Sequence, residues 1–337
     1  ARAGSPRRTC GPLLRSSPLT RRPVPVNDVT DAPAARLGLE VPAGWRLREA
    51  IGPRRFLTRA TVIRPDGVEV EWSSRRHRKG LAPRHRRARR VERPRDLVAG
   101  ATPRSLWMGG LFMIGSACFA FGSLPGIDDH VDETVLGWVF FVGSIFFTLA
   151  GYLQFRECVN APTTIDPAGP RPRGLRGLVG WRPRSVGWWS TSVQLVGTMA
   201  FNVSTFAATR GSLSLGQERE LVWAPDVLGS ACFLVASWLA YVEVSPRVLH
   251  PPRRDLGLHI ATVNLVGSIA FGVSAIAARY PTSTGEPANT DLANTSTLMG
   301  AICFFVGAAL LPVESSTDRV HEQPGTPPHG TVPQPAG

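Results

Sequence analysis

Hydrophobic residues concentrate after residue 104, in six runs that contain no Asp, Glu, Lys or Arg. The runs are residues 105–127, 135–155, 185–209, 227–242, 256–278 and 292–313. A helix that spans a bilayer needs roughly 20 apolar residues, and all of the runs except the fourth reach that length. The fourth reaches it if Trp223 and Asp226 lie at the membrane interface. Buried helices of soluble proteins are rarely this long and uncharged, so the pattern predicts an all-α integral membrane protein with six transmembrane helices.

Each run contains one spaced pattern, in which Phe follows a glycine by four residues and Gly, Ala or Ser follows it by seven. The stretch GSACF, at residues 115–119 and again at 229–233, is the most similar pair. These positions lie on one face of a helix, and small residues let helices approach closely in lipid. We predict helix packing by three repeated helical hairpins; the alternative is a ligand cavity lined by six equivalent faces. The predicted packing residues are Gly115, Phe119, Gly122, Gly143, Phe147, Ala150, Gly197, Phe201, Ser204, Gly229, Phe233, Ala236, Gly267, Phe271, Ser274, Gly300, Phe304 and Gly307.

The runs also carry a family resemblance over residues 105–315. WMGGLFMIGSACFAFGS and WVFFVGSIFFTLAGYLQF resemble the YrhK-like domain, a two-helix membrane module. QLVGTMAFNVSTFAA, VWAPDVLGSACFLVASWLAYVEV, NLVGSIAFGVSAIAA, TGEPANTDLAN and GAICFFVGAALLPVE are similar to bacterial multi-span proteins that carry this domain. The resemblance implies a bacterial membrane protein. It carries over no catalytic residue, because that family has no settled activity.

The formal net charge of +13 comes from arginines that precede the first run. Arginine returns after the second and fourth runs, whereas IDDHVDET after the first run is acidic. By the positive-inside rule we expect a multi-pass protein of the plasma membrane with both termini in the cytoplasm. The basic stretch after residue 74 has almost no apolar residue, so we expect it to be solvated or bound to anionic headgroups. Nucleic-acid binding is the alternative, but the stretch lacks interleaved aromatic residues.

The segment FLTRATVIRPDGVEVEWSS predicts a β-hairpin over residues 56–73, because RPDG is a turn sequence between two alternating runs. The expected organisation places soluble segments around three hairpins. It comprises a disordered Arg- and Pro-rich segment (1–50), a basic cytoplasmic region (51–104), a first hairpin that is YrhK-like (105–157), a cytoplasmic linker (158–184), a second hairpin (185–244), a second linker (245–255), a third hairpin (256–314) and a disordered tail (315–337).

Three glutamates occupy equivalent positions at the ends of the even runs. Glu157, Glu243 and Glu314 each lie fourteen residues after the glycine of their run. A carboxylate at a helix C-terminus is disfavoured by the helix dipole, so the repetition needs a reason. One interpretation is pairing with cytoplasmic arginines, such as Arg156 or Arg247. The other is a cation or proton site at the cytoplasmic mouth of a pathway.

Other polar residues provide weaker candidates. Gln194 and Asn264 precede their glycines by three residues, and Asn202 lies deeper in the third run. Interhelical hydrogen bonds are the expected role of these amides, and substrate contact is the alternative. The acidic loop could hold a divalent cation loosely, but its spacing matches no known metal motif, so a solvated loop is expected. The cysteines have no metal-ligand spacing, and Cys118, Cys232 and Cys303 share a small-residue position three residues after a glycine.

No catalytic motif is recognisable, so we expect a non-enzymatic structural or sensory membrane module without a cofactor or metal. Its expected partners are the bilayer, anionic headgroups at the basic region and, for a homo-oligomer, further copies of the chain. The alternative is a small transporter or channel for a cation, a proton or a small solute. Glu157, Glu243, Glu314, Gln194, Asn202 and Asn264 are the candidate polar pathway residues.

Overall fold

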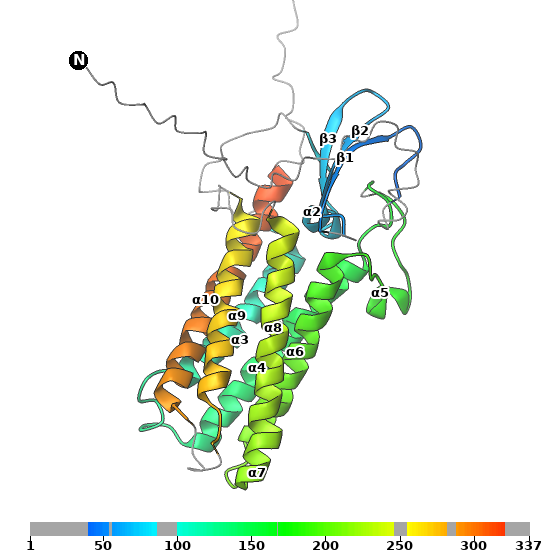
Figure 1. Ribbon diagram of the computed structural model, residues 1–337. Helices are drawn as coiled ribbons and strands as arrows, with labels where there is room; N and C mark the ends of the chain where they lie inside the picture. The colour runs from blue at the N-terminus through cyan, green and yellow to red at the C-terminus, as the bar shows by residue number, and fades with distance from the viewer. Residues whose placement is uncertain are drawn as a thin grey trace, which may run out of the picture.

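The computed structural model describes residues 40–53, 56–85, 100–166, 168–245, 255–281 and 288–320. The described chain forms a long helical bundle with a small antiparallel sheet at one end (Figure 1). The disorder expected in residues 1–39 and 321–337 lies outside the described residues, as does the basic stretch 86–99. Within the described part, the prediction of a mainly helical protein with a small N-terminal β-structure is confirmed.

Six long helices make up the bundle: α3 (Pro103–Gly122), α4 (Glu133–Val159), α6 (Val186–Ala208), α8 (Ala224–Val244), α9 (Leu256–Ala277) and α10 (Thr290–Val320). Side-chain caps help to define where several of them begin. Thr102 Oγ1 accepts a hydrogen bond from the backbone N–H of Ser105 at 3.0 Å, and Ser185 Oγ accepts one from Trp188 at 3.2 Å. The short α7 (Leu215–Gln217) and the π-helical turn η2 (Glu218–Trp223) lead directly into α8.

Five helical segments of the described chain are long and apolar enough to cross a membrane, and they indicate a membrane protein. They are Pro103–Gly122, Glu133–Val159, Leu215–Val244, Leu256–Ala277 and Thr290–Arg319. The fourth predicted run thus gains its length from α7 and η2, which place Asp226 inside a continuous helical segment. Helix α6 has 23 residues and no charge, but its serine, threonine and amide side chains lower its mean hydropathy. Its crossing of the membrane remains a prediction.

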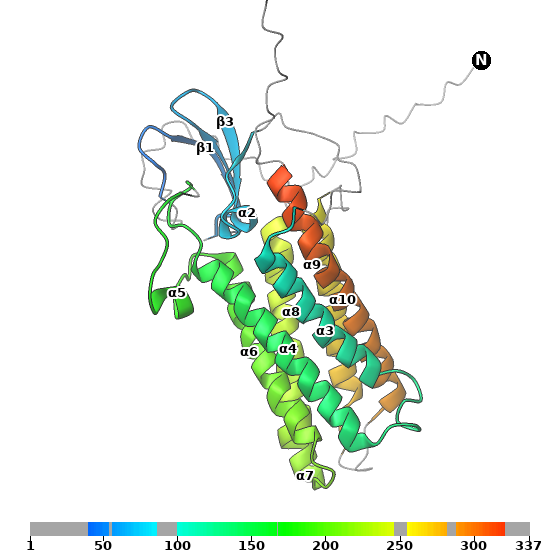
Figure 2. The ribbon, with the colours of Figure 1, turned by 180° about the vertical axis from the view of Figure 1, so that it is seen from behind.

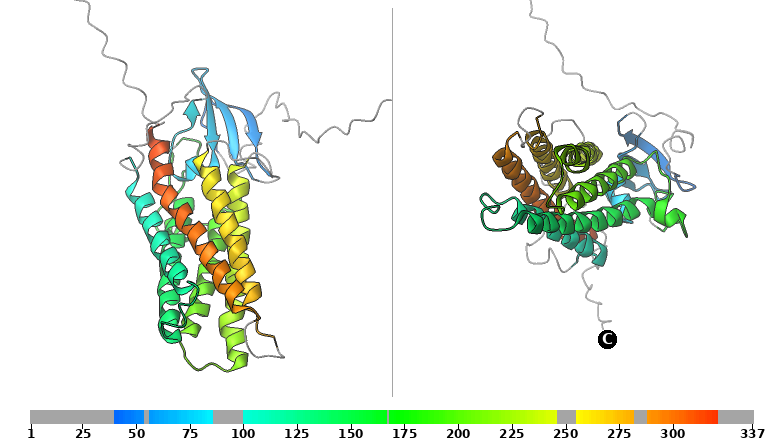
Figure 3. Two further views of the ribbon diagram at one scale, coloured as in Figure 1. Left: turned by 90° about the vertical axis from the view of Figure 1, so that its left-hand side faces the viewer. Right: turned by 90° about the horizontal axis from the view of Figure 1, so that it is seen from below.

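The helices follow one another around a closed ring, in chain order. Each packs against the helix before it and the helix after it, and α10 closes the ring by packing against α3. The two opposite views in Figures 1 and 2 and the end-on view in Figure 3 show this arrangement around one long axis. Chain neighbours run antiparallel, and the connection between α4 and α6, residues 160–185, contains the short helix α5 (Arg176–Val179).

Phenylalanine rings fill the middle of the ring of helices. One ring triangle comes from α3, α6 and α9, with centroids 6.1–6.3 Å apart: Phe119, Phe201 and Phe271. A second comes from α4, α8 and α10, with centroids 5.5–6.1 Å apart: Phe147, Phe233 and Phe304. Further ring contacts join the two triangles within each hairpin at 5.2–5.6 Å, mostly edge to face. Such contacts add roughly 0.5–1.5 kcal/mol per pair beyond burial, so the triangles form one continuous apolar core.

The glycines of the repeated pattern lie where the helices of a hairpin approach most closely. A Cβ atom at Gly115, Gly229 or Gly300 would lie 2.7–3.0 Å from a phenylalanine ring of the partner helix. In the other helix of each hairpin, a Cβ atom at Gly143, Gly197 or Gly267 would lie 2.8–2.9 Å from Cβ of Cys118, Cys232 or Cys303. Side chains larger than glycine therefore do not fit without moving the helices apart.

The small residue at the seventh position contacts the partner helix in several hairpins. Ser204 Oγ donates to the carbonyl of Val222 at 2.8 Å, and Ser274 Oγ donates to the carbonyl of Ala293 at 2.9 Å. Ala150 and Ala236 are buried. A Cβ atom at Gly122 would lie 2.7 Å from the ring of Phe140, and one at Gly307 would overlap the Asn264 amide.

The N-terminal sheet is antiparallel with strand order β1 (Arg46–Ile51), β2 (Arg59–Ile63), β3 (Glu69–Ser73) and β4 (Arg84–His85). Strands β2 and β3 form the predicted hairpin, with Ile63 opposite Glu69 and Gly67 in the left-handed conformation at φ +77°. Alternate residues face a core that includes Val62, Val70 and Trp72. Ile165, from the connection between α4 and α6, completes this core and is fully buried.

Three boundary expectations are corrected by these elements. Strand β1 begins inside the segment 1–50 that was expected to be disordered, because it pairs with β2 and buries Leu47. The basic stretch from Arg75 was expected to be solvated or bound to headgroups, yet up to residue 85 it contributes to helix α2 (Ser74–Arg78) and strand β4. Helix α10 continues to Val320, beyond the expected start of a disordered tail at residue 315, because Asp318 pairs with basic side chains.

Candidate functional site

The three equivalent glutamates lie around one short basic helix at the sheet end of the bundle. Helix α2 follows β3 directly and carries Arg75, Arg76 and Arg78, with Lys79 as the next residue. Figure 1 shows α2 between the sheet and the ends of the long helices. The glutamate side chains are almost completely buried, with exposed fractions of 12% for Glu157, 0% for Glu243 and 8% for Glu314.

Arg78 joins two of the three carboxylates. Its Nη1 pairs with Oε2 of Glu243, and its Nε lies 3.6 Å from Oε1 of Glu157. Ser74 Oγ donates a second hydrogen bond to Glu243 Oε1 at 2.5 Å. Burial acts to lower the pKa of the Arg78 guanidinium, but the carboxylates, above all Glu243, raise it above its usual value. Arg78 is therefore charged at every physiological pH.

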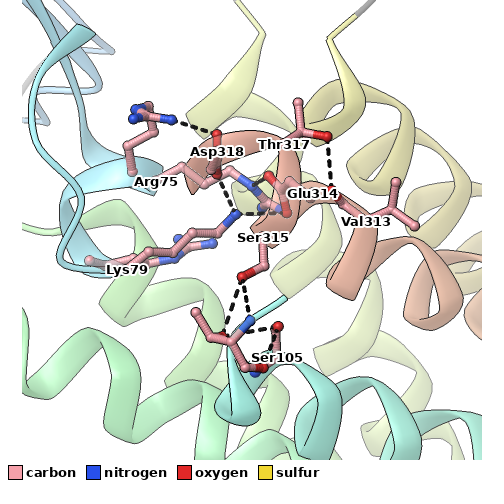
Figure 4. A network of polar contacts seen from close by, with 12 residues as sticks. Arg75, Lys79, Ser105, Val313, Glu314, Ser315, Thr317 and Asp318 are labelled. Atoms are coloured by element: carbon pink, nitrogen blue, oxygen red, sulfur yellow. Dashed lines mark hydrogen bonds and ion pairs between the residues drawn. The ribbon is translucent and has the colours of Figure 1, made fainter. Parts of the chain in front are cut away.

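The third carboxylate is held by Arg75 and Lys79 (Figure 4). Arg75 donates to Glu314 through Nε at 2.6 Å and through Nη2 at 2.9 Å, which is a bidentate arrangement. Lys79 Nζ lies 2.9 Å from Glu314 Oε2 and 3.1 Å from Asp318 Oδ2. Burial opposes the charge on Arg75, but the facing Glu314 carboxylate still raises its pKa.

Asp318, one turn after Glu314 on α10, extends the cluster. Arg76 Nη1 lies 2.5 Å and Arg84 Nη2 lies 2.9 Å from its Oδ1 atom. We call Glu157, Glu243, Glu314 and Asp318, together with the basic residues of α2, Lys79 and Arg84, the carboxylate cluster. Buried charges are stable only when paired and hydrogen-bonded, and here each carboxylate faces at least one cation.

Glycines in the first turns of α6 and α9, the third and fifth long helices, make room for the cluster. A Cβ atom at Gly187 would lie 2.6 Å from Arg78 Nη1 and 3.1 Å from Glu243 Oε1. A Cβ atom at Gly257 would lie 3.0 Å from Glu314 Oε1 and 3.2 Å from Arg75 Nε. Both glycines precede the pattern glycine of their helix by ten residues. Their spacing is a signal that sequence reasoning missed.

His77 fixes the other side of α2. Its Nε2 lies 3.0 Å from the carbonyl oxygen of Pro162, so Nε2 carries the proton and donates. Its Nδ1 is buried and has no hydrogen-bond partner among the described residues. Burial lowers the pKa of His77, as do the nearby Arg182 and Arg171, and these effects outweigh the hydrogen bond to Pro162. His77 is therefore neutral in the folded protein at pH 7.

The glutamates pair with arginines, but the partners in the described residues are not the suggested Arg156. The partners come from α2, which lies far away in the sequence, whereas Arg156 is exposed and Arg247 lies outside the described residues. The other interpretation was a cation or proton site at the mouth of a pathway; in the structure the glutamates face basic side chains. Two surface pockets, one between α4 and α6 and one on the sheet, are not lined by Glu157, Glu243 or Glu314.

The candidate amides do not share one site. The Asn202 amide lies 2.9 Å from Thr148 Oγ1, between α6 and α4, and nearby Ser144 contacts Thr205 at 3.0 Å. Asn264 lies against Gly307 between α9 and α10. Gln194 is half-buried on α6. The amides thus lie at different helix interfaces, and none belongs to the carboxylate cluster.

Two pockets of the described structure lie at its surface. A groove of about 520 Å³ between α4 and α6 is lined mainly by apolar residues, with Asn202 and Arg210 among them. Another space of about 370 Å³ lies on the sheet, beside Arg48 and Arg59. Neither enters the phenylalanine core.

The acidic loop has a structural role in the described chain. Asp132 Oδ1 accepts a hydrogen bond from the backbone N–H of Thr134 at 2.9 Å and caps α4. His130 Nδ1 lies 3.0 Å from the carbonyl of Gly126. Among the described residues, no group of three or more His, Cys, Asp or Glu side chains could hold a metal ion.

Comparison with models of protein families, with curated proteins and with solved structures found no match to this chain.

Proposed function

We propose that the chain is a six-span membrane module with a structural or sensory role, in which the N-terminal sheet docks on the bundle through the carboxylate cluster. Three equivalent hairpins, descended from one unit, would surround the phenylalanine core, with α6 as the sixth span. The two ring triangles carry this proposal, because they occupy the axis along which a solute would pass. A core at protein density leaves no continuous path for water or ions.

The proposed orientation places the sheet, α2 and both termini in the cytoplasm of a bacterium. Arg171, Arg173 and Arg176 lie in the connection at the sheet end, whereas Asp128 and Asp129 lie in the connection at the other end. This distribution is the one expected from the positive-inside rule. We also propose the anionic headgroups of the inner leaflet as partners of the basic N-terminal region, and binding to nucleic acid is not part of the proposal.

Helix α6 needs a separate argument for crossing the membrane, because its mean hydropathy is lower. Several of its polar side chains have protein partners: Ser190 Oγ donates to the Ala236 carbonyl at 2.8 Å, and Thr205 Oγ1 donates to the Phe201 carbonyl at 2.6 Å. Its outward residues Val196, Met199 and Val203 are each 52% exposed. Polar groups satisfied inside a bundle cost little in lipid.

The transporter alternative rests on the same glutamates. Carboxylates at one end of a bundle could attract a cation, but here Arg75, Arg78 and Lys79 already neutralise them. For transport, α2 would have to leave and the phenylalanine core would have to open. Because both steps break buried contacts, the static module is favoured. We also propose that the chain has no enzymatic activity.

Flux measurements test this proposal. Purified full-length protein in vesicles should move protons, Na⁺ and K⁺ no faster than protein-free vesicles do. A steady ion flux that disappears when Glu157, Glu243 and Glu314 are all replaced by Gln would refute the structural module and favour transport. The spans are tested separately with reporter fusions in the 128–131 and 210–214 connections, both of which should be outside the cell. A cytoplasmic 210–214 connection would contradict the crossing of α6.

A further inference from the structure

The connection between α4 and α6 presents apolar side chains outward in a region that lies outside the long helices. Residues 175–181, which include helix α5 (Arg176–Val179), form this feature, and we call them the α5 segment. Leu175 is 77% exposed, Val179 is 69% exposed and Trp181 is 71% exposed. Groups of exposed apolar side chains usually mark a binding surface, so the α5 segment requires a partner.

The backbone of the α5 segment is held against the protein, while its large apolar side chains are exposed. A Cβ atom at Gly177 would lie 2.9 Å from Asn160 Oδ1, and one at Gly180 would lie 2.8 Å from Val159. Asn160 Nδ2 donates to the carbonyl of Gly177 at 2.8 Å. The guanidinium of Arg182 donates to the carbonyls of Ala161 and Pro162. Glycine backbone and an arginine are therefore directed inward, while the large apolar side chains are directed outward.

Tryptophans connect the α5 segment to the first turn of α6. The Trp181 ring lies 4.7 Å from that of Trp188 and 6.2 Å from that of Trp189, both edge to face. Trp188 Nε1 donates to the carbonyl of Gly180 at 2.9 Å. Figures 1 and 2 both show α5 beside the bundle, near the ends of α4 and α6 and on the bundle side of the sheet. The α5 segment thus lies where the apolar surface of α6 begins.

We propose that the α5 segment is an in-plane membrane anchor, which inserts Leu175, Val179 and Trp181 into the interfacial zone of a leaflet rich in anionic phospholipid. Aromatic residues favour this zone, and short apolar faces bind it without crossing the bilayer. Arg173 and Arg176 are exposed beside the apolar residues and match the charge of anionic headgroups. The Trp181 ring contacts that of Trp189 on α6, and the outward residues Val196 and Met199 follow along that helix, which favours lipid over a protein partner.

This proposal rests on the proposed membrane location and adds a role for a connection that the spans leave unexplained. The anchor would hold the start of α6 and, through Ile165 in the same connection, the position of the sheet relative to the leaflet. The sheet and the bundle would then be linked in two places, by the carboxylate cluster and by the α5 segment.

Site-directed spin labelling of the full-length protein in vesicles tests the anchor. A label at Val179→Cys is compared with one at Ile51→Cys, a partly exposed position on β1, in a background in which the native cysteines are Ala. Oxygen, which concentrates in lipid, should collide with the label at 179 more often than a water-soluble nickel complex does. At Ile51 the order should be reversed. The lipid preference at 179 should increase when phosphatidylglycerol is added to pure phosphatidylcholine. This increase should be smaller when Arg173 and Arg176 are replaced by Gln.

Three results would overturn the anchor. A label at 179 that behaves like the label at 51 would place the α5 segment in water. A label reached by neither reagent would mean that protein covers it. Immersion that is equal in both lipid mixtures would remove the anionic preference. Resistance to alkaline extraction is measured in parallel, because a protein that is extracted would refute the membrane location itself, whereas an integral protein with a water-exposed label refutes the anchor alone.

Discussion

Replacing Arg78 by Met should release helix α2 from the bundle. The substitution keeps an unbranched side chain but removes the charge that faces Glu243 and Glu157. Glu243 is completely buried. Among the contacts described, it would keep only the Ser74 hydroxyl, at 2.5 Å. The variant therefore leaves two buried carboxylates without their shared cation.

The cost follows from the burial of the pair. Removing one partner of a buried ion pair costs about 3–5 kcal/mol. A free-energy change of about 1.4 kcal/mol corresponds to a factor of ten in an equilibrium. The population with α2 undocked should therefore increase by a factor of between about a hundred and a few thousand. The matched control is Arg48→Met, because Arg48 pairs with Glu69 on the sheet surface, with exposed fractions of 55% and 27%. Exposed pairs contribute about 0–1 kcal/mol, so the control should change little.

The thiol of Cys158 reports the undocking. Cys158 is 3% exposed and lies close to Gly187, the same glycine that Arg78 packs against. A charged, water-soluble maleimide should modify Cys158 slowly in the parent protein and much faster in the Arg78→Met variant. Peptide mass spectrometry separates this site from the other cysteines. The rate follows the open population as long as α2 redocks faster than the thiol reacts.

A double variant separates docking from local access. Adding Glu243→Met to Arg78→Met removes both charges of the closer pair and leaves only Glu157 without its cation. Apolar replacement of a whole buried pair is often neutral or stabilising. The double variant should therefore label more slowly than the single variant, although the same arginine is missing. The reasoning is refuted if Arg78→Met labels at the rate of Arg48→Met, or if the double variant labels as fast as the single one.

Three further predictions concern the core and α2. Gly229→Leu should lower the melting temperature in detergent, because its Cβ would lie 3.0 Å from the Phe201 ring, and overpacking costs about 1–3 kcal/mol. Gly272→Leu, with nothing within 4 Å, should melt like the parent, and an equal shift in both variants would contradict the packing account. Phe233→Ala should cost about 3–5 kcal/mol of unfolding free energy, measured by denaturant titration; a loss below 1 kcal/mol would argue against a filled axis. Since burial lowers the pKa of His77, docking stability should be complete above its usual value of 6.5 and decline as the pH falls below it. Proteolysis of the sheet against pH measures this, and an unchanged profile in His77→Gln would refute the role of that proton.

Much of the bundle could be predicted from the sequence, because the spacing of residues within each helix indicates which face is buried. The pattern of Gly, Phe and a small residue lies within a single helical run, so its period gives the packing face without knowledge of the neighbours. Gly229 and Phe201 illustrate this, because the contact that joins them is the one that the shared face suggests. The equivalence of Glu157, Glu243 and Glu314 could likewise be read from spacing alone.

The partners of those glutamates could not be read in that way. A run such as SRRHRK looks solvated when each residue is judged by its own polarity. Burial of Arg75 and Arg78 becomes favourable only when carboxylates from separate helices converge on them, and no local signal in the basic run records that convergence. The same limit applies to Ile165, whose place in the sheet core depends on how the α4–α6 connection returns.

Local chemistry thus determined the helices, their packing faces and the β2–β3 hairpin, because backbone hydrogen bonding and side-chain period are properties of short segments. Only the tertiary structure determined the long-range features, which are the closed ring of helices, the two triangles of Phe rings and the docking of α2. Each of them depends on side chains from several helices meeting at once. Their free energy exists only in the assembled structure, and for that reason the residue that neutralises Glu243 was found more than a hundred and sixty positions away, at Arg78.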